Sequence, residues 1–189
     1  PLGKQGLPEF DPKTLKVRGH PIYLAGDASS RRPILHEAVD DGRVAGFNSV
    51  RPEPRLFKRP TPLDIAFTDP NIAVVGRTFA SLAGRAFVTG EASFKTQARA
   101  LIMGEAEGLL HVYADPADGM FLGAEMVGPA GEHLAHLMAW SLQQGLTVSE
   151  MLAMPFYHPT VEEGLRTALR DAALRCRGRK ARARRSSGV

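Results

Sequence analysis

The stretch Met154-Pro155-Phe156-Tyr157-His158-Pro159-Thr160-Val161-Glu162-Glu163-Gly164 lies near the end of a chain of 189 residues. Two prolines bracket an aromatic pair and a histidine, and a helical pattern containing a carboxylate follows. Histidine is the side chain that most readily exchanges protons near neutral pH. A histidine base needs a second group that fixes its tautomer and holds the ring. If Thr160 caps a helix, Glu163 lies in the first turn and reaches back to His158, so the stretch predicts an acid/base pair.

The same spacing also has a purely structural interpretation. Thr160-x-x-Glu163 is the pattern of a capping box, in which the threonine hydroxyl accepts from the amide three residues on and the glutamate reaches back. Spacing alone favours this interpretation, and a lone histidine in a turn is more often structural than catalytic. Both interpretations stay open at this level.

The length of 189 residues predicts one domain and part of another, and the composition is typical of a globular protein. Hydrophobic residues make up 43% and charged residues 23%, and no run approaches the ~20 apolar residues of a membrane span. The chain does not open on a signal peptide, so a cytoplasmic location is expected. Cys176 is the single cysteine, which excludes an internal disulfide framework and a cysteine-based metal site. No metal is expected.

The charge is unevenly distributed. Seven basic residues and no acid lie between Arg175 and Arg185, and subtracting them from the formal net charge of +4 leaves −3 for the remainder. Such a segment could contact nucleic acid or another anionic surface. Its composition offers little apolar area to bury, so residues 175–189 are predicted to be a disordered basic tail, and nucleic acid is not an expected partner.

The first part of the chain has the sequence pattern of an α/β domain, a predicted strand followed by a predicted helix. Residues 21–25 form a short apolar run that predicts a strand, and the run stops at Gly26-Asp27. A carboxylate after a strand is typical of ligand sites in α/β folds, where Asp27 would accept hydrogen bonds from hydroxyl groups. As an isolated motif, Gly-Asp is also an ordinary turn. Residues 34–48 carry the apolar spacing of a helix.

Residues 50–62 contain four prolines and are predicted to be a linker. Beyond it, strands are predicted at residues 64–68, 72–75, 86–88, 97–103, 109–114 and 121–127. Helices are predicted at residues 78–84, 131–144, 147–154 and 160–174. The segregation of strands and helices indicates an α+β fold, with an antiparallel sheet covered by helices on one side and a remnant of an α/β domain in front of it.

Three motifs together resemble the C-terminal part of the pyridine nucleotide-disulfide oxidoreductases, and most of all the dihydrolipoamide dehydrogenases. They are Ala25-Gly26-Asp27 with the helix after it, Met126-Val127-Gly128-Pro129-Ala130-x-Glu132, and His158-Pro159-Thr160-x-x-Glu163. The resemblance covers roughly residues 20–174. It implies that residues 1–49 are a remnant of the FAD-binding domain and that residues 63–174 are the interface domain of a homodimer.

The resemblance also implies roles for particular residues. His158 would be the acid/base that acts in the active site of the partner subunit, with Glu163 as its orienting group and a cis bond before Pro159. Asp27 would bind the ribityl chain of FAD, and the amides near Leu35 and His36 would face the flavin. The implied substrate is a dihydrolipoyl group on a carrier protein, and NAD is the implied electron acceptor.

Other family features are absent from the sequence. It contains no Gly-x-Gly-x-x-Gly loop to cradle a dinucleotide, and a single cysteine cannot supply the redox pair. The chain is therefore expected to be inactive alone and to bind FAD weakly or not at all. Glutathione reductase-like enzymes keep the His-Pro-Thr motif and remain an alternative, whereas mercuric reductases end in a cysteine pair that is missing here. A non-catalytic dimerisation module is the alternative from another class.

Overall fold

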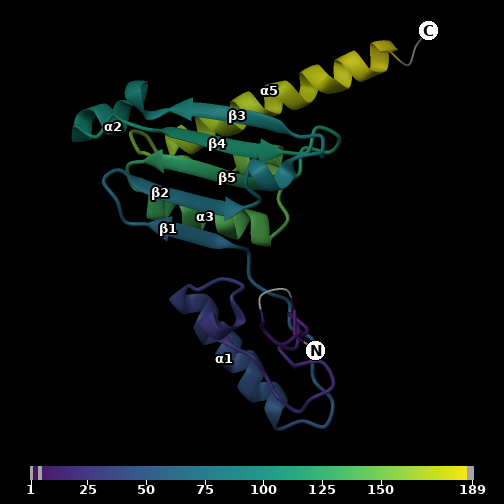
Figure 1. Cartoon of the computed structure of the whole chain (residues 1–189). Helices are drawn as coiled ribbons and strands as arrows, with labels where there is room; N and C mark the ends of the chain where they lie inside the picture. The colour runs from purple at the N-terminus through teal and green to yellow at the C-terminus, as the bar shows by residue number, and fades with distance from the viewer. Residues whose placement is uncertain (1, 4–5, 187–189) are drawn as a thin grey trace. The chain divides into compact units, whose positions relative to one another are not determined.

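The computed structural model describes residues 2–3 and 6–186, with side chains placed as far as residue 179. The chain forms two compact units, residues 1–59 and residues 60–189, which are described separately (Figure 1). The division falls within the segment 50–62 that the sequence predicts to be a linker.

The first unit is built around helix α1 (Leu35–Ser49), which confirms the helix expected at residues 34–48. The prediction of a strand at residues 21–25 is wrong. That segment makes only an isolated bridge between Tyr23 and Lys16, and a short 3-10 helix η1 (Gly26–Ser29) follows it. A strand persists only where neighbouring strands pair with it, and the described residues of this unit supply only isolated bridges.

Buried polar side chains hold the first unit together. Asn48 is fully buried, and its amide donates to the carbonyls of Thr14 and Arg55 at 3.0 and 3.1 Å and accepts from the Arg55 amide at 2.9 Å. Arg59 pairs with the buried carboxylate of Asp41. Arg55 and Arg59 therefore contact α1, so residues 50–59 of the expected linker are part of the first unit.

The second unit contains one five-stranded sheet. Its strands are β1 (Leu63–Ala66), β2 (Asn71–Gly76), β3 (Val88–Ser93), β4 (Leu109–Ala114) and β5 (Phe121–Gly128). They pair antiparallel in the order β1-β2-β5-β4-β3. The turn between β4 and β5 ends at Gly119, whose φ of 83° favours glycine.

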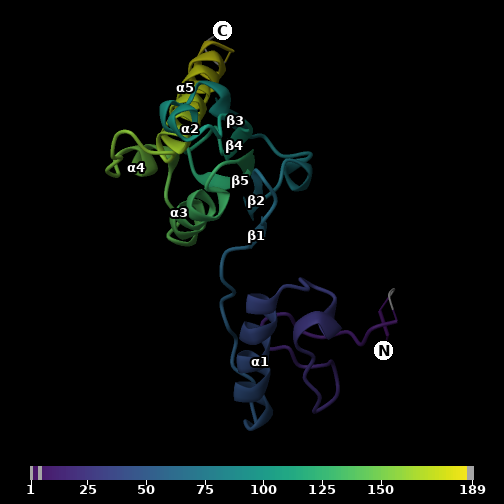
Figure 2. The same ribbon diagram turned by 90° about the vertical axis from the view of Figure 1, so that its left-hand side faces the viewer.

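Three helices cover one face of this sheet: α3 (Gly131–Gln143), α4 (Val148–Leu152) and α5 (Glu163–Ser186) (Figure 2). Helix α3 packs against β1, β2 and β5, and α5 packs against β3 and β4. Gly90 lets α5 approach β3 closely, because a Cβ there would overlap the Ala168 carbonyl oxygen and lie 2.6 Å from the Cβ of Ala172. The arrangement confirms the predicted α+β class with helices on one side.

Two further expectations need correction. Residues 97–103, expected as a strand, are the short helix α2 (Ala98–Met103), because Gln97 caps it by accepting from the Ala100 amide at 2.7 Å. The last helix, expected to end at residue 174, continues to Ser186. Arginine and alanine are good helix formers, and adding residues to an existing helix avoids the cost of nucleation. The backbone of residues 175–186 is thus helical rather than irregular, while mobility of this segment in solution stays a prediction.

The remaining elements are short. The helix expected at residues 78–84 is the 3-10 turn η2 (Ala80–Leu82), and a further 3-10 turn, η3 (Phe94–Thr96), joins β3 to α2. Within the described part of the chain, no helix has both the length and the apolar composition to span a membrane.

Candidate functional site

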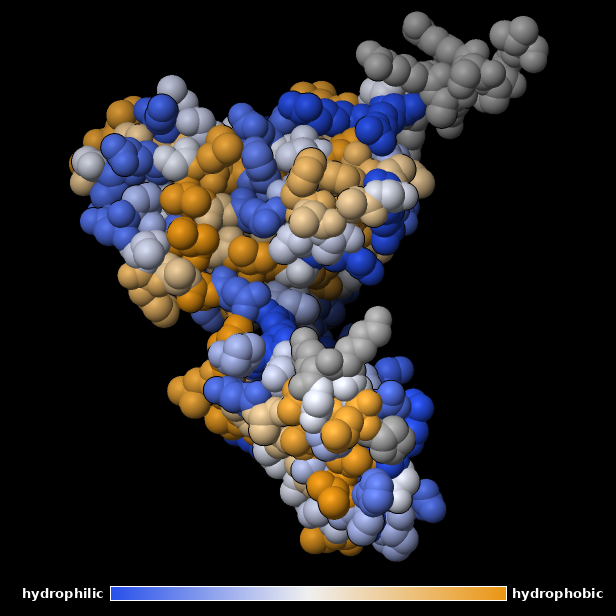
Figure 3. All heavy atoms as spheres, viewed as in Figure 1, coloured by the Kyte–Doolittle hydropathy of each residue, from blue (hydrophilic) through white to orange (hydrophobic). Residues whose placement is uncertain are grey.

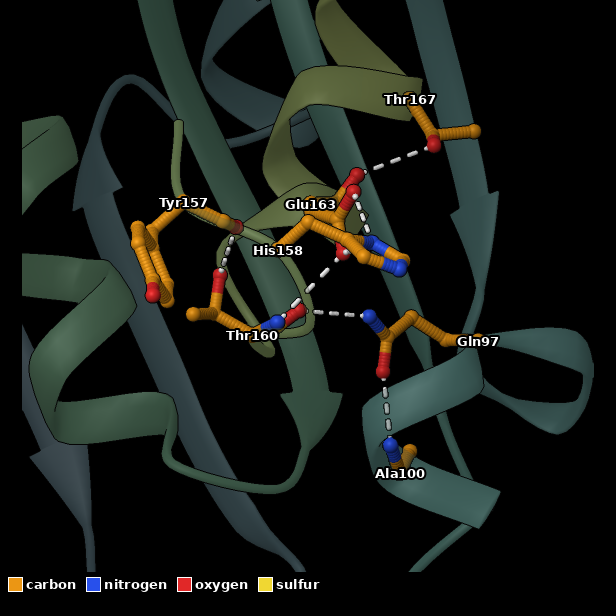
Figure 4. A network of polar contacts seen from close by, with 7 residues as sticks. All are labelled: Gln97, Ala100, Tyr157, His158, Thr160, Glu163 and Thr167. Carbon is orange, nitrogen blue, oxygen red and sulfur yellow. Dashed lines mark hydrogen bonds and ion pairs between the residues drawn. The ribbon is translucent and has the colours of Figure 1, made fainter. Parts of the chain in front are cut away.

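The His158 turn joins α4 to α5 and presents the imidazole at the surface. The bond between His158 and Pro159 is cis, as the family resemblance implies. Nδ1 of His158 lies 2.9 Å from Oε2 and 3.1 Å from Oε1 of Glu163 (Figure 4). Both distances fall within the range expected for a hydrogen-bonded pair. The predicted contact between the two side chains is therefore present.

The geometry leaves one ring nitrogen available. An ionised carboxylate only accepts hydrogen bonds, so a neutral imidazole in this contact donates its proton from Nδ1 and keeps Nε2 as an acceptor. The side chain of His158 is 74% exposed, and that of Glu163 is 25% exposed. Nε2 points away from Glu163 (Figure 4). A proton acceptor with a fixed tautomer thus faces outward from the turn.

The competing interpretation as a capping box is only half realised. The Thr160 hydroxyl donates to the Tyr157 carbonyl at 2.9 Å. The Glu163 carboxylate does reach the Thr160 amide, but at 3.4 Å, longer than its contact with His158. The Glu163 carboxylate thus serves mainly the histidine and secondarily the helix start.

A complete capping box elsewhere in the chain provides the comparison. At the start of α4, the hydroxyl of Thr147 accepts from the Glu150 amide, and the Glu150 carboxylate accepts from the Thr147 amide at 2.7 Å. Thr147-x-x-Glu150 and Thr160-x-x-Glu163 have identical spacing, but only Glu163 has a histidine partner. The two patterns therefore differ in which group the glutamate carboxylate contacts.

Gln97 is a neighbour of the histidine turn that the sequence does not identify. Its amide nitrogen donates to the Thr160 carbonyl at 2.7 Å, while its oxygen caps α2 (Figure 4). This bond ties the histidine turn to the start of α2, just beyond the C-terminal end of β3. Gln97 occupies the capping position before α2. The sequence prediction assigns residues 97–103 to a strand, so it does not consider a cap there.

The electrostatics of the pair favour an ionised glutamate. Partial burial raises the pKa of Glu163, but the hydrogen bonds from His158 and the Thr160 amide lower it more, so the pKa of this carboxyl lies below its usual range. Glu163 is also the first residue of α5, where the positive end of the helix dipole stabilises negative charge. Glu163 is thus the anion that a protonated His158 would need beside it.

An apolar groove of about 470 Å³ lies beside the histidine turn, between α3 and the start of α5. Large side chains on its rim are exposed: Trp140 by 64%, Tyr157 by 80% and Met154 by 49%. Exposed apolar patches of this kind usually mark a surface that another protein covers.

The residues expected to bind a flavin lie in the first unit, so the structure does not assemble them with His158 and Glu163 into one described site. Asp27 is exposed on η1, which lies against α1 because Gly26 approaches Ala38 closely. Leu35 and His36 are exposed in the first turn of α1, which has no side-chain cap. An uncapped helix start and a nearby carboxylate are compatible with one wall of a flavin site. These roles stay a prediction.

Comparison with known proteins identifies the α+β unit as a dimerisation domain. Residues 63–169 match the dimerisation domain of the pyridine nucleotide-disulphide oxidoreductases. The chain belongs to this family.

The similar proteins are longer than this chain. Dihydrolipoyl dehydrogenases of Haloferax volcanii and Thermus scotoductus are 35% and 34% identical to this chain over 80% and 78% of its length. The match covers 32% of each relative, so the chain spans about a third of their length. Among solved structures, LpdA of Mycobacterium tuberculosis superposes with a TM-score of 0.76 at 25% identity, covering 90% of this chain and 37% of that one. The Escherichia coli flavoprotein disulfide reductase RclA shares the fold, with a TM-score of 0.72 at 20% identity over 91% of this chain and 39% of its own.

Proposed function

We propose that this chain is the C-terminal part of a cytoplasmic, flavin-dependent dithiol–disulfide oxidoreductase that oxidises a dihydrolipoyl group with FAD and NAD. His158 and Glu163 are its acid/base pair. The observation that carries the proposal is the contact of 2.9 Å between a largely exposed imidazole and a carboxylate of lowered pKa. The relatives named as dihydrolipoyl dehydrogenases support the choice of substrate.

The reaction class explains why such a pair is needed. Oxidising a dithiol to a disulfide removes two protons and two electrons, and the attacking species in disulfide exchange is the thiolate. Nε2 of His158 accepts the proton of the substrate thiol, and Glu163 stabilises the imidazolium that results. When bound, FAD would pass the electrons to NAD. Asp27 and the amides near Leu35 and His36 would hold the flavin from this chain's side.

The proposal places the site between two subunits. The sequence lacks the cysteine pair and the dinucleotide loop, so the chain is inactive by itself, and His158 acts on the dithiol site of a partner subunit in a homodimer. The apolar rim around Trp140 beside the histidine turn supports a contact there. Replacing Trp140 with Glu should shift the chain to monomers in analytical ultracentrifugation, and an unchanged association constant would contradict a contact through this rim.

The catalytic test separates the two half-reactions. In the protein that carries this chain behind flavin- and nicotinamide-binding domains, His158→Gln should slow flavin reduction by dihydrolipoamide by about 10²-fold or more, the usual scale of lost general-base catalysis. Flavin reduction by NADH needs no thiol deprotonation and should change little. Stopped-flow absorbance measures both rates.

The chain provides a matched control. His111 and Glu91 form another imidazole–carboxylate pair, at 3.0 Å, on strands β4 and β3, with a half-buried His111 and an exposed Glu91. His111→Gln should leave both half-reactions unchanged. If His158→Gln slows both half-reactions equally, His158 supports folding or dimerisation and the proposed role is wrong.

A further inference from the structure

A hollow of about 590 Å³ lies between the start of β3 and the C-terminal half of α5, away from the histidine turn. One side is aromatic, with Phe79 and Phe87 in edge-to-face contact at 5.5 Å and Phe87 backed by Tyr113 at 5.7 Å. Phe79 as a whole residue is 60% exposed. The hollow therefore offers an open aromatic surface.

Three arginines line the same hollow. Arg85 is held by Asp115 at 2.8 Å, and Arg175 is held by Asp171 at 3.0 Å. Arg179 is exposed and has no ion-pair partner among the side chains that the structure describes. Two guanidinium groups are thus fixed in place, and the third remains available for an anion.

The positive charge continues along the helix beyond the hollow. After Asp171 the chain contains no acidic residue, and between positions 175 and 185 it has six arginines and one lysine. The helix extends to Ser186, and strongly hydrophilic residues gather where it leaves the sheet (Figures 1 and 3). At 1.5 Å per residue, residues 175–186 span about 16 Å. We call this segment the basic arm.

We propose that the hollow and the basic arm together bind single-stranded nucleic acid. Proteins that bind single strands combine a positively charged path for the phosphates with aromatic side chains on which bases stack. Phe79 supplies the stacking surface, and Arg179 supplies the phosphate contact beside it, while the sequence of the basic arm adds positive charge along the helix. The preference for arginine over lysine matches the bidentate geometry of phosphate recognition.

Other anionic partners fit these features less well. An anionic membrane surface would need large apolar side chains along the basic arm, whose apolar residues from position 177 onward are alanines apart from the terminal Val189. An acidic polypeptide would satisfy the arginines but would leave the exposed ring of Phe79 without a planar partner. A duplex keeps its bases stacked on one another, so it offers phosphates alone.

The test uses the whole 189-residue chain and a fluorescein-labelled oligothymidylate of about 12 nucleotides, within the site sizes of single-strand binders. Fluorescence anisotropy at several salt concentrations gives the affinity and its salt dependence. Phe79→Ala should weaken binding by about tenfold through lost stacking. Arg179→Gln should reduce the slope of log K against log salt by about 0.7, the contribution of one phosphate contact on a single strand.

Arg99 provides the matched control, because it is an exposed arginine on α2, at the opposite end of β3 from the hollow. Arg99→Gln should bind as the parent does, and circular dichroism should show that all three variants are folded. Polyglutamate, duplex DNA of equal length and anionic vesicles serve as competitors.

The competitors show whether binding of the oligothymidylate depends on base stacking or on charge alone. Weak competition by all three, together with the loss in Phe79→Ala, supports a single-strand site. The proposal is overturned if a competitor displaces the strand as well as unlabelled oligothymidylate does, if folded Phe79→Ala binds normally, or if no binding is seen at low salt. The test is independent of the oxidoreductase proposal, since it measures no redox activity.

Discussion

Replacing Gly90 with alanine tests the packing that holds α5 on the sheet. A Cβ at this position would overlap the Ala168 carbonyl and lie 2.6 Å from the Cβ of Ala172. Carbon atoms pack best at about 3.5–4.0 Å, so the helix and the strand must separate by about 1 Å. Overpacking of this kind costs about 1–3 kcal/mol. The free energy of unfolding of the second unit should fall by that amount.

Trp140 is the single tryptophan of the chain and lies on α3, so its fluorescence reports on the unfolding of the second unit. With a urea dependence of about 1–3 kcal/mol per molar, the expected loss lowers the unfolding midpoint by about 1 M. Gly178→Ala, in the helix α5 that packs on Gly90, is the matched control. A Cβ there meets open space, and alanine favours a helix interior over glycine by up to about 1 kcal/mol, so this variant should be as stable as the parent or more so.

Opposite responses of the two glycines would support the packing argument. If Gly90→Ala unfolded at the same urea concentration as the parent, α5 would not press on β3 as closely as the structure shows. If both substitutions destabilised the chain equally, the effect would belong to helix α5 as a whole and not to the contact at Gly90.

Three further predictions concern single side chains, all measured by urea unfolding with Trp140 fluorescence. Hydrogen bonds lower the pKa of Glu163 in the folded state, so its contribution to stability is complete above the usual carboxyl range and is lost as the pH falls through the lowered value. Glu163→Gln should therefore flatten the acid dependence of stability in that range, and parallel curves for parent and variant would argue against it. Thr147→Ala removes the hydroxyl of the complete capping box and should cost about 1 kcal/mol, which Thr147→Ser should largely restore. Phe94 is fully buried between Gly128 and Gly164, and Phe94→Ala should cost about 3–5 kcal/mol, so a loss below 1 kcal/mol would mean that the site collapses to fill the space.

Local signals in the sequence were sufficient for much of the second unit. The Asp115–Gly119 turn after the alternating run at residues 109–114 predicts the β4–β5 hairpin, and the spacing of Leu134, Met138 and their neighbours predicts α3. These features depend on residues close together in the chain, and their periodicity states directly which face is buried. The class of the fold follows from them.

Short motifs without such periodicity needed tertiary contacts. The run at residues 21–25 has strand composition but no partner strand among the described residues, so it remains irregular apart from one bridge. Residues 97–103 mix apolar and polar positions, and only the cap by Gln97 shows that they form a helix. Gln97 also reaches the Thr160 carbonyl, a contact between residues far apart in the sequence.

The histidine site shows most clearly what each level contributes. The sequence by itself determined which residue types meet in the turn, and that Glu163 falls in the first turn of a helix beside His158. It could not determine which donor the Glu163 carboxylate would serve, because Thr147-x-x-Glu150 has the same spacing and forms a plain capping box. That choice was decided by the turn after α4, held to α2 by Gln97, which places the imidazole nitrogen 2.9 Å from the carboxylate, closer than the competing amide at 3.4 Å. The physical reason is that a hydrogen bond forms where donor and acceptor are brought together in space, and sequence spacing fixes that position only within a single turn.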